Sequence, residues 1–537
     1  MKNVKKIIVL GGGSAGWMTA STLIKEYPDK EITLIESPNT PIVGVGESTI
    51  GGIKFWTTYL GIDDNEFFKY TDATYKLSIR FEDFYKKGDG GFHYPFGEPY
   101  HSDYFQGRKT WIMKKILQPE TPYYDYAESM YPIMALVRNK TIVPHNNHNL
   151  PLHNFDRNVA YHFDATKFGI WLRDNFCIPK GVKHIIEDIT SVETNDDGIK
   201  SLNKKYTADL FVDCTGFKSM LLGGALKEPF ISYSDMLPNN KAWATRVPYK
   251  DKENQLEPYT NCTAIENGWV WNIPSWERIG TGYVYSDKYI SDDEALNEFK
   301  RHLDKKGHDY SNSDFKNIKM RVGRHERVFV KNVVAIGLSA GFIEPLESNG
   351  LYSTHEFLHR LVRILNRGDK ETISQFDKDS YDSACKSNFD EFAEFVAAHY
   401  ALSHREDTEY WRDVNKRQYS KDLVNSKPSF ITGFISFVYG KFRDYEHKEG
   451  GFDNISIGMR NLPMDLDTLH HSEIIRDEDE LKNEIENHYR ESINKMEINK
   501  FEWDRFAKKQ IKMKDLIKEN FGTRAFSTVG GLVTLKP

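Results

Sequence analysis

Residues 6–35 carry the apolar and polar pattern of a strand, a helix and a second strand. Residues 6–10 are a short, continuous apolar run that ends at a glycine turn, residues 11–16. Residues 17–27 show helical spacing, and residues 31–35 are again apolar and end at Glu36. A buried strand, a glycine turn and a helix in this order are typical of a βαβ unit with parallel strands.

The same kinds of pattern recur further along the chain. Residues 209–212 and 332–336 are apolar runs that end in turns, and residues 240–285 have the β-branched and aromatic bias of an antiparallel sheet. Residues 75–81 alternate, which predicts one strand with Lys76, Ser78 and Arg80 on one face. Residues 86–155 are interpreted as irregular insertions. Helix predominates after about residue 350, and residues 478–500 predict an amphipathic surface helix.

Composition narrows the class of protein without identifying it. Of 537 residues, 28% are charged and 39% hydrophobic, which is typical of a globular chain. The net charge of -6 gives no reason to expect nucleic acid or an acidic membrane as a partner. The chain holds 4 cysteines and no Cys-x-x-Cys pair, so neither a metal site nor a redox dithiol is expected. The apolar runs are too short to span a bilayer, and the cytoplasm is the expected location.

The glycine turn has the spacing of a dinucleotide fingerprint. Gly11, Gly13 and Gly16 form Gly-x-Gly-x-x-Gly between strand and helix, with Ser14 and Ala15 opening the helix. Such a turn brings backbone N–H groups to a pyrophosphate, and an acid at the end of the next strand, here Glu36, can bind a ribose hydroxyl. The fingerprint alone does not separate NAD from FAD. The later turns that begin at Asp213 and at Gly337-Leu338 favour FAD.

These elements together predict an α/β fold with three parts. The first is an FAD-binding, Rossmann-like core over residues 1–368. Substrate-facing segments at about residues 86–155 and 226–319 are inserted in it, the latter with the antiparallel sheet. The third is a mainly helical C-terminal subdomain over residues 369–537.

The segment from Gly341 to Gly350 is the most informative stretch outside the fingerprint. It links an apolar strand to a helix, so free N–H groups at the helix start can bind an anion, and it carries Glu347 beside them. By itself, Glu347 would be a solvated loop acid. Lys76 would be a surface lysine, and Trp269 and Trp271 would be core aromatics on one face of a strand. His93, in an aromatic loop with Phe96, would be a packed histidine.

Several separated motifs, in order, give these residues a shared meaning, and the chain resembles the flavin-dependent halogenases of the tryptophan-halogenase family. The resemblance covers most of the first 415 residues. Besides the fingerprint, it rests on Gly44-Val45-Gly46-Glu47-Ser48-Thr49, Tyr75-Lys76, Tyr161-His162-Phe163-Asp164-Ala165, the run from Trp269 to Pro274, residues 333–350, and the run from His399 to Arg405.

The resemblance implies a reaction and a role for each motif. Reduced FAD from a separate reductase, O2 and a halide give hypohalous acid, which passes to Lys76 and halogenates an aromatic ring. Glu347 assists as the second catalytic residue, Asn349 and Gly350 hold the halide, and Trp269 and Trp271 lie near the flavin. His93 and Phe96 are expected in the substrate pocket. The expected FAD contacts are Gly11, Gly13, Ser14, Ala15, Gly16, Glu36, Gly46, Asp213, Gly337 and Leu338.

One departure from the family pattern concerns the halide. The family has Thr at the position of Asn349, which leads to the hypothesis that bromide or iodide is used at least as well as chloride. Free tryptophan is one candidate substrate beside other indoles and phenols. Two alternatives stay open: a flavin monooxygenase without halogenation, and a catalytically silent FAD-binding protein. The oligomeric state is not fixed by the sequence, and a homo-oligomer is compatible with it.

Overall fold

A six-stranded sheet contains the predicted βαβ unit. The computed structural model describes residues 4–40, 47–100, 108–145, 147–366, 372–417, 419, 448–460, 478–521, 526–529 and 532–535. The strand order is β19-β20-β11-β1-β2-β8, and β20, β11, β1, β2 and β8 run parallel. Their bounds are β1 (Lys6–Leu10), β2 (Glu31–Glu36), β8 (Lys183–Ile186), β11 (Leu210–Asp213), β19 (Phe329–Val330) and β20 (Val333–Ala335). Helix α1 (Ser14–Glu26) follows the glycine turn as predicted.

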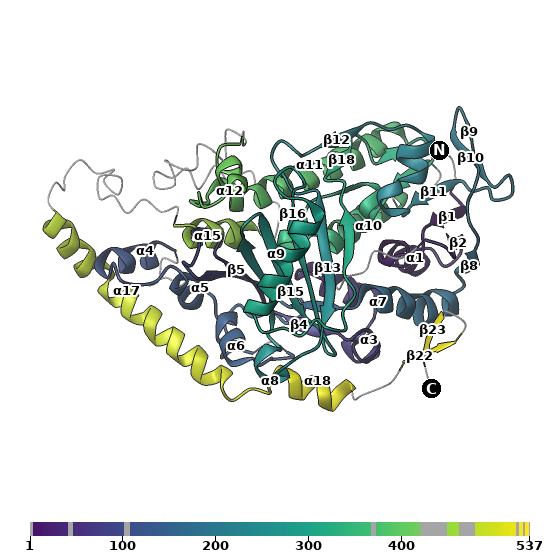
Figure 1. The fold of residues 1–537 in the computed structure, drawn as a ribbon. Helices are drawn as coiled ribbons and strands as arrows, with labels where there is room; N and C mark the ends of the chain where they lie inside the picture. The colour runs from purple at the N-terminus through teal and green to yellow at the C-terminus, as the bar shows by residue number, and fades with distance from the viewer. Residues whose placement is uncertain are drawn as a thin grey trace.

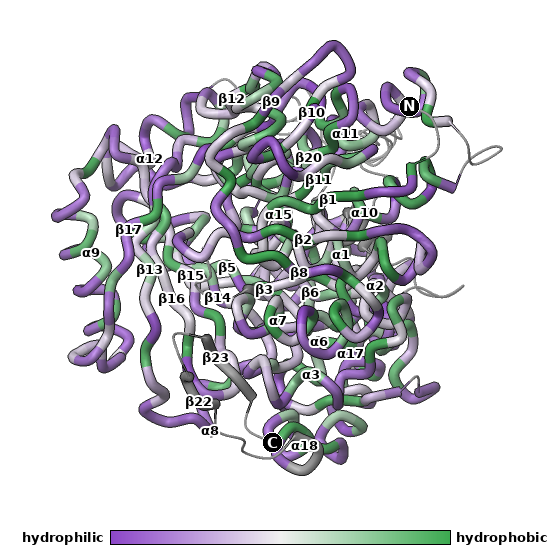
Figure 2. Tube along the Cα trace, turned by 90° about the vertical axis from the view of Figure 1, so that its right-hand side faces the viewer, coloured by the Kyte–Doolittle hydropathy of each residue, from purple (hydrophilic) through white to green (hydrophobic). Residues whose placement is uncertain are grey.

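A seven-stranded sheet is the predicted antiparallel region. Its order is β17-β13-β16-β15-β14-β5-β6, and the pairing is antiparallel except between β14 and β5. The bounds are β5 (Ser78–Glu82), β6 (Gly91–Pro95), β13 (Lys241–Val247), β14 (Tyr259–Ile265), β15 (Gly268–Pro274), β16 (Ile279–Tyr285) and β17 (Lys316–Lys319). Helix α9 (Asp292–Lys305) covers one face of this sheet, at the outside of the molecule (Figures 1 and 2).

The two faces of this sheet have different surroundings. Cross-strand partners share a face, so Phe81, Cys262 and Trp271 form one row on the inner face. Arg80 and Asn261 form the neighbouring row on the outer face, toward α9. The inner face is the one that packs against the loop before α10 (Gly350–Leu365), since the Cys262 Sγ lies 3.8 Å from the carbonyl of Leu346.

The strand predicted over residues 75–81 is in fact two strands in different sheets. It breaks at Leu77: β4 (Thr74–Lys76) pairs with β7 (Ala160–Phe163) in a small sheet with β3 (Glu47–Ser48), whereas β5 joins the large sheet. The Leu77 N–H donates instead to the carbonyl of Pro258. The prediction that Lys76 shares a face with Ser78 and Arg80 is therefore wrong, because alternation does not continue through a break.

Residues 86–155 are more regular than predicted, since they hold β6 and three helices. These are α4 (Arg108–Leu117), α5 (Asp125–Met130) and α6 (Ile133–Asn139). The predicted surface helix is α17 (Glu478–Ala507), which packs along α4, α5 and α6 at the lower left edge of Figure 1. The C-terminal region is mainly helical, as predicted, with α11 (Gln375–Ala401), α12 (Glu409–Val414), α15 (Lys448–Gly458) and α18 (Met513–Phe521), followed by β22 (Phe526–Val529) and β23 (Leu532–Leu535).

The remaining elements connect these layers. They are α2 (Gly52–Leu60), α3 (Asp64–Thr71), α7 (Ala165–Trp171), α8 (Lys252–Gln255), β9 (Val192–Asn195), β10 (Gly198–Leu202), β12 (Phe230–Ser232), β18 (Gly323–His325) and β21 (Gly341–Phe342). Among the described residues, no helix is both long and apolar enough to cross a membrane. All four cysteines are buried free thiols, as expected.

Candidate active site

The glycine turn between β1 and α1 has the geometry of a dinucleotide cradle. Gly11 has a φ of +114°, and a Cβ there would lie 2.3 Å from the carbonyl oxygen of Cys214, so only glycine fits. Gly16 packs just as tightly, since a Cβ would lie 1.8 Å from the Gly11 carbonyl oxygen. A Cβ on Gly13, in contrast, would meet nothing within 4 Å, so the space over the start of α1 is open. This is the shape that a pyrophosphate needs.

Glu36 stands where a ribose contact is expected, at the end of β2. Its Oε1 lies 2.6 Å from the Nε2 of His184 on β8, and its Oε2 lies close over Gly12. His184 therefore fixes the carboxylate, a role that the sequence did not reveal. Gly46, also predicted to contact the cofactor, lies outside the described residues.

Asp213, a predicted cofactor contact, is bound by the turn that follows β11. Its buried carboxylate accepts hydrogen bonds from the Thr215 N–H and Oγ1 at 3.1 and 2.6 Å, and from the N–H groups of Leu221 and Leu222 at 2.7 and 3.0 Å. Each of the two carboxylate oxygens accepts two of these hydrogen bonds. Asp213 thus fixes the shape of the turn after β11.

Replacing Asp213 with Asn is expected to lower the free energy of unfolding by about 2–4 kcal/mol, because one amide NH2 would then face donors and leave buried N–H groups unsatisfied. Chemical denaturation measures this. Asp209→Asn is the matched control, since Asp209 accepts from the Lys5 and Lys6 N–H groups at an exposed site and its loss should cost under about 1 kcal/mol. Equal effects of the two substitutions would contradict the assignment.

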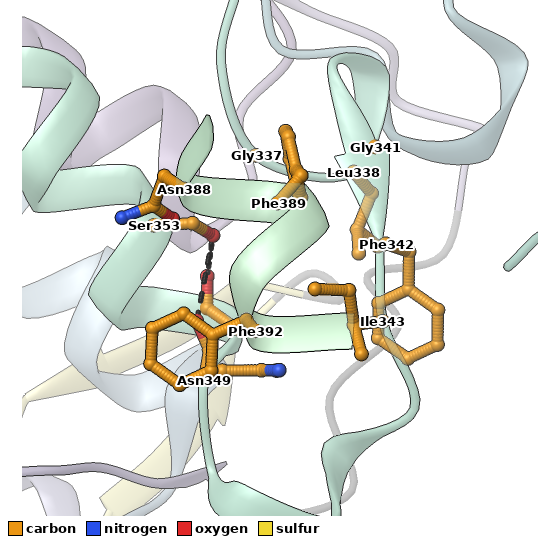
Figure 3. A pocket seen from close by; sticks show the side chains of 11 residues that line it. Gly337, Leu338, Gly341, Phe342, Ile343, Asn349, Ser353, Asn388, Phe389 and Phe392 are labelled. Atoms are coloured by element: carbon orange, nitrogen blue, oxygen red, sulfur yellow. Dashed lines mark hydrogen bonds between the residues drawn. The ribbon is translucent and has the colours of Figure 1, made fainter. Parts of the chain in front are cut away.

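The predicted flavin and halide segments line one pocket. Gly337 has a φ of +70°, and a Cβ there would lie 2.7 Å from the Cβ of Ala15, which places this segment against the start of α1. Figure 3 shows Gly337 and Leu338 on one side of the pocket and Asn349 on another. Asn388 of α11 also lines it, and nothing in the sequence marked that residue.

Asn349 offers an unused donor in this pocket. The side chain is 5% exposed, and its Nδ2 has no hydrogen-bond partner among the residues that the structure describes. In Figure 3 the amide nitrogen points across the pocket toward Ile343. Gly350 begins α10, where the first N–H groups have no partner within the helix, and a Cβ on it would meet nothing within 4 Å. A buried, unsatisfied N–H beside a helix start is suited to a small anion.

Lys76 and Glu347 both lie inside the protein rather than on its surface. Lys76 is 0% and Glu347 1% exposed. The Lys76 Nζ donates to the Thr49 carbonyl and to the Ser348 Oγ, both at 2.9 Å, so it reaches the residue next to Glu347. Lys76 and Glu347, whose proximity the sequence alone could not predict, therefore lie in one buried cluster.

Burial decides the charge of both groups. Desolvation lowers the pKa of Lys76 to about 7, against a smaller opposing effect of Cys262 and Glu347. Burial likewise raises the pKa of Glu347, which His399 and then Lys76 partly offset. The His399 Nε2 lies 3.0 Å from the Glu347 Oε1, and both side chains are enclosed. Shifted pKa values on paired, enclosed groups are typical of catalytic sites.

Trp269 and Trp271 share a face of β15, as predicted. Their ring centroids are 6.2 Å apart with the planes at 60°, and both rings are buried. Trp271 pairs across the sheet with Cys262, whose thiol lies against the loop of Glu347. The tryptophan pair therefore forms part of the inner face beside the lysine–glutamate cluster.

The structure does not bring His93 to this cluster. His93 pairs with Arg80 on the outer face, where its Nδ1 lies 3.0 Å from the Ser78 Oγ. Tyr94, the next residue of β6, has the inner orientation, and burial and then the charge of Glu347 raise its pKa. The Phe96 ring centroid lies 5.2 Å from the Lys76 Nζ, so Phe96, unlike His93, lies beside the cluster. Strand alternation from Phe96 would have selected Tyr94 over His93.

The fold and the site define the class of this protein. A glycine turn before α1, a pocket against it, and a buried lysine and carboxylate beside two tryptophans agree with what the resemblance to the flavin-dependent halogenases implies. A family model described as tryptophan halogenase matches residues 6–473, which extends beyond the 415 residues of the resemblance. The chain belongs to the tryptophan halogenase family.

Individual relatives agree with this assignment. The chain is 36% identical over 447 residues to tryptophan 6-halogenase ThaL of Streptomyces albogriseolus, covering 79% of this chain and 81% of that protein. It is 35% identical over 445 residues to tryptophan 7-halogenase RebH of Lentzea aerocolonigenes, with 79% and 81% covered.

Solved structures are similar over nearly the whole chain. The apo structure of VirX1 has a TM-score of 0.83 and 33% identity, covering 96% of this chain and 99% of that one. Tar14, a tryptophan C-6 flavin-dependent halogenase (chlorinase) from taromycin biosynthesis, has a TM-score of 0.81 and 27% identity over the same shares.

Proposed function

We propose that this enzyme halogenates an indole- or phenol-type small molecule by electrophilic aromatic substitution, with reduced FAD, O2 and a halide, and that hypohalous acid acts through Lys76. The observation that carries the proposal is the burial of Lys76 in one cluster with Glu347. A monooxygenase that transfers only oxygen would have no use for an enclosed lysine at this place, whereas an oxidised halogen needs a donor or an amine to direct it.

The residues of the cradle fit FAD. Gly11, Gly13, Ser14, Ala15 and Gly16 would hold the pyrophosphate, Glu36 would bind the ribose, and Gly337 and Leu338 would lie along the flavin, because open space exists at the start of α1 and at the pocket beside it. When bound in reduced form, the flavin supplies with O2 the oxidation of halide to hypohalous acid. Reduced FAD is expected from a separate flavin reductase, as no second nucleotide site is assigned.

The chain's own residues direct the oxidant and the proton. The Asn349 amide and the Gly350 N–H hold the halide, and Lys76, with a pKa of about 7, is available both as a neutral amine and as a charged donor. Glu347 accepts the proton that leaves the ring. Its raised pKa suits a base that must work at neutral pH. Trp269 and Trp271 wall the cluster and keep the ring from the oxidising centre.

Aromatic side chains set the substrate class. Tyr94 and Phe96 lie on the inner side of β6 and the loop after it, and the aromatic character of this wall near Lys76 suits an aromatic substrate. Free tryptophan is one candidate, and other indoles and phenols fit the same chemistry. We place the reaction in the cytoplasm, without nucleic acid or membrane, and a homo-oligomer is compatible with it.

Asn349 is expected to favour the larger halides. A larger anion loses less hydration on burial and is more easily oxidised, and the amide adds one donor to the helix start. Turnover with bromide or iodide should at least equal that with chloride at the same concentration. Asn349→Thr, which restores the residue usual in the family at this position, should lower the bromide-to-chloride ratio several-fold. A clear chloride preference of the wild type would refute this.

An aerobic assay tests the function as a whole. It contains FAD, a generic flavin reductase, NADH, one halide at a time and a panel of indoles and phenols, read by mass spectrometry. The expected result is a product that carries the halogen. A product that gains only oxygen would establish the monooxygenase instead, and FAD binding with no product from any substrate or halide of the panel would favour a silent flavoprotein.

A further inference from the structure

An unbroken chain of hydrogen bonds leads from Lys76 to a buried histidine. The Lys76 Nζ donates to the Ser348 Oγ at 2.9 Å, and the Ser348 Oγ donates to the Ser48 Oγ at 3.1 Å. Ser48 and Thr260 hydroxyls lie 2.5 Å apart, and the Thr260 Oγ1 lies 2.9 Å from the Nε2 of His162. The chain crosses four segments that are far apart in the sequence and ends on a group that can bind a proton.

The far end of the chain fixes its direction. Beyond His162, the Nδ1 lies 3.3 Å from the Thr74 Oγ1, which donates to the Pro274 carbonyl at 2.8 Å. A carbonyl only accepts, so the Thr74 hydroxyl hydrogen is used there and Thr74 must accept from His162. The Nδ1 of neutral His162 therefore carries the hydrogen, and its Nε2 presents a lone pair to Thr260. Each donor from Lys76 to His162 points the same way.

Both ends of this chain are buried, and Ser48 in its middle is partly exposed. Lys76 and His162 are 0% exposed, and Thr260 is 2% exposed. The charge of Glu347 reaches Lys76, and the charge of Lys76 reaches His162. Burial, and then the Lys76 charge, hold the pKa of His162 well below its usual value, so the imidazole is neutral while Lys76 is charged. The repulsion from Lys76 disappears when Lys76 loses its proton.

We infer that Thr260 and His162 draw a proton from Lys76 during turnover, Thr260 as the relay and His162 as the acceptor, and so make the Lys76 amine neutral. One N–H bond of the Lys76 ammonium breaks and one N–H bond forms at the His162 Nε2, while Ser348, Ser48 and Thr260 each receive a proton and pass on their own. No electron moves, and the proton returns along the same chain. Neither residue touches substrate, and both act through Lys76 as positioning residues. The inference rests on the proposed function, which does not itself require Thr260 or His162.

Three variants of the full-length enzyme test the relay. Thr260→Val removes the hydroxyl, Thr260→Ser keeps it, and His162→Gln can still accept a hydrogen bond but cannot take a proton. Halogenation is measured with bromide and the fastest substrate of the panel from pH 5.5 to 9, a window chosen to bracket the pKa of about 7 for Lys76. Flavin oxidation is followed in parallel. Thr281→Val is the matched control, since Thr281 is 1% exposed in the same sheet and donates to the Trp271 carbonyl at 2.8 Å.

With the relay intact, the rate should change little just below pH 7. In Thr260→Val and His162→Gln, only molecules whose Lys76 is already neutral can react, so the rate should fall about tenfold per pH unit below pH 7, with KM and flavin oxidation unchanged. Thr260→Ser and Thr281→Val should follow the wild type. Profiles of Thr260→Val and His162→Gln that run parallel to the wild type overturn the relay alone. A wild type that forms no halogenated product overturns the proposed function and the relay with it.

Discussion

Replacing Lys76 with Met is expected to reduce halogenation by at least about 10³-fold while FAD binding and flavin oxidation persist. Methionine fills a similar volume but offers no N–H group and no lone pair to the oxidant. The Lys76 Nζ donates to the Thr49 carbonyl and to the Ser348 Oγ, and the Phe96 ring lies near its remaining side. With that group absent, hypohalous acid would react with other nucleophiles or leave the protein. Product is read by mass spectrometry and flavin oxidation by absorbance.

The loss should not come from unfolding, and pH separates the two. The pKa of Lys76 is lowered from 10.5 to about 7 in the folded protein, so between these values the unfolded chain binds more protons and stability rises with pH. Lys76→Met removes this cost. Its gain in melting temperature should be largest at or below pH 7 and should vanish above pH 10.5. A variant that is more stable and yet inactive identifies a catalytic lysine.

A second buried lysine serves as the control for this substitution. Lys378 of α11 is 8% exposed and donates to the Lys331 carbonyl, away from the site. Lys378→Met should keep halogenation within a few-fold of the wild type. If Lys76→Met still halogenates, the catalytic assignment of Lys76 is wrong, and if Lys378→Met fails equally, the effect is structural.

Local signals in the sequence predicted the strands, turns and helices around the expected cofactor site. The fingerprint glycines, Glu36 at the end of β2, and the strand, loop and helix around residues 333–365 are contiguous, so each segment specifies its own geometry. Gly11 shows why: its positive φ and its contact with Cys214 leave room for no other residue, and such a requirement is visible in the sequence itself.

Packing between distant segments could not be predicted in the same way. The break at Leu77 depends on the Pro258 carbonyl, which no local pattern announces, and it turns Lys76 away from the face of Ser78. The aromatic residues 91–96 predict a loop, so strand alternation does not apply there and His93 is selected instead of Tyr94. Thr260 reaches the cluster through its contacts with Ser48 and His162, which are 212 and 98 residues away in the sequence. Local elements of the candidate site were therefore predictable, but not the distant residues that pack around it.

Replacing Glu347 with Gln is the second large effect we expect, a loss of halogenation of about 10²-fold or more with flavin oxidation unchanged. Glutamine keeps the shape of the side chain beside His399 but cannot accept the ring proton. In the wild type the carboxylate form must be present, and because burial raises the pKa of Glu347, activity should fall as pH drops through this raised pKa. That acidic limb should disappear from the residual activity of Glu347→Gln.

Glu344, three positions earlier in the same loop, offers a matched control for Glu347. It is equally buried, and burial raises its pKa to about 7, but its Oε2 accepts a hydrogen bond from the Asn239 amide at 2.7 Å. Because Asn239 already holds this carboxylate, Glu344→Gln should lose less than about tenfold, the cost of disturbing one hydrogen bond. If both substitutions had the same effect, the loop would need its negative charge or its shape, and Glu347 would not be the base. A large loss confined to Glu347→Gln, together with its changed pH profile, would establish proton removal from the ring as its role.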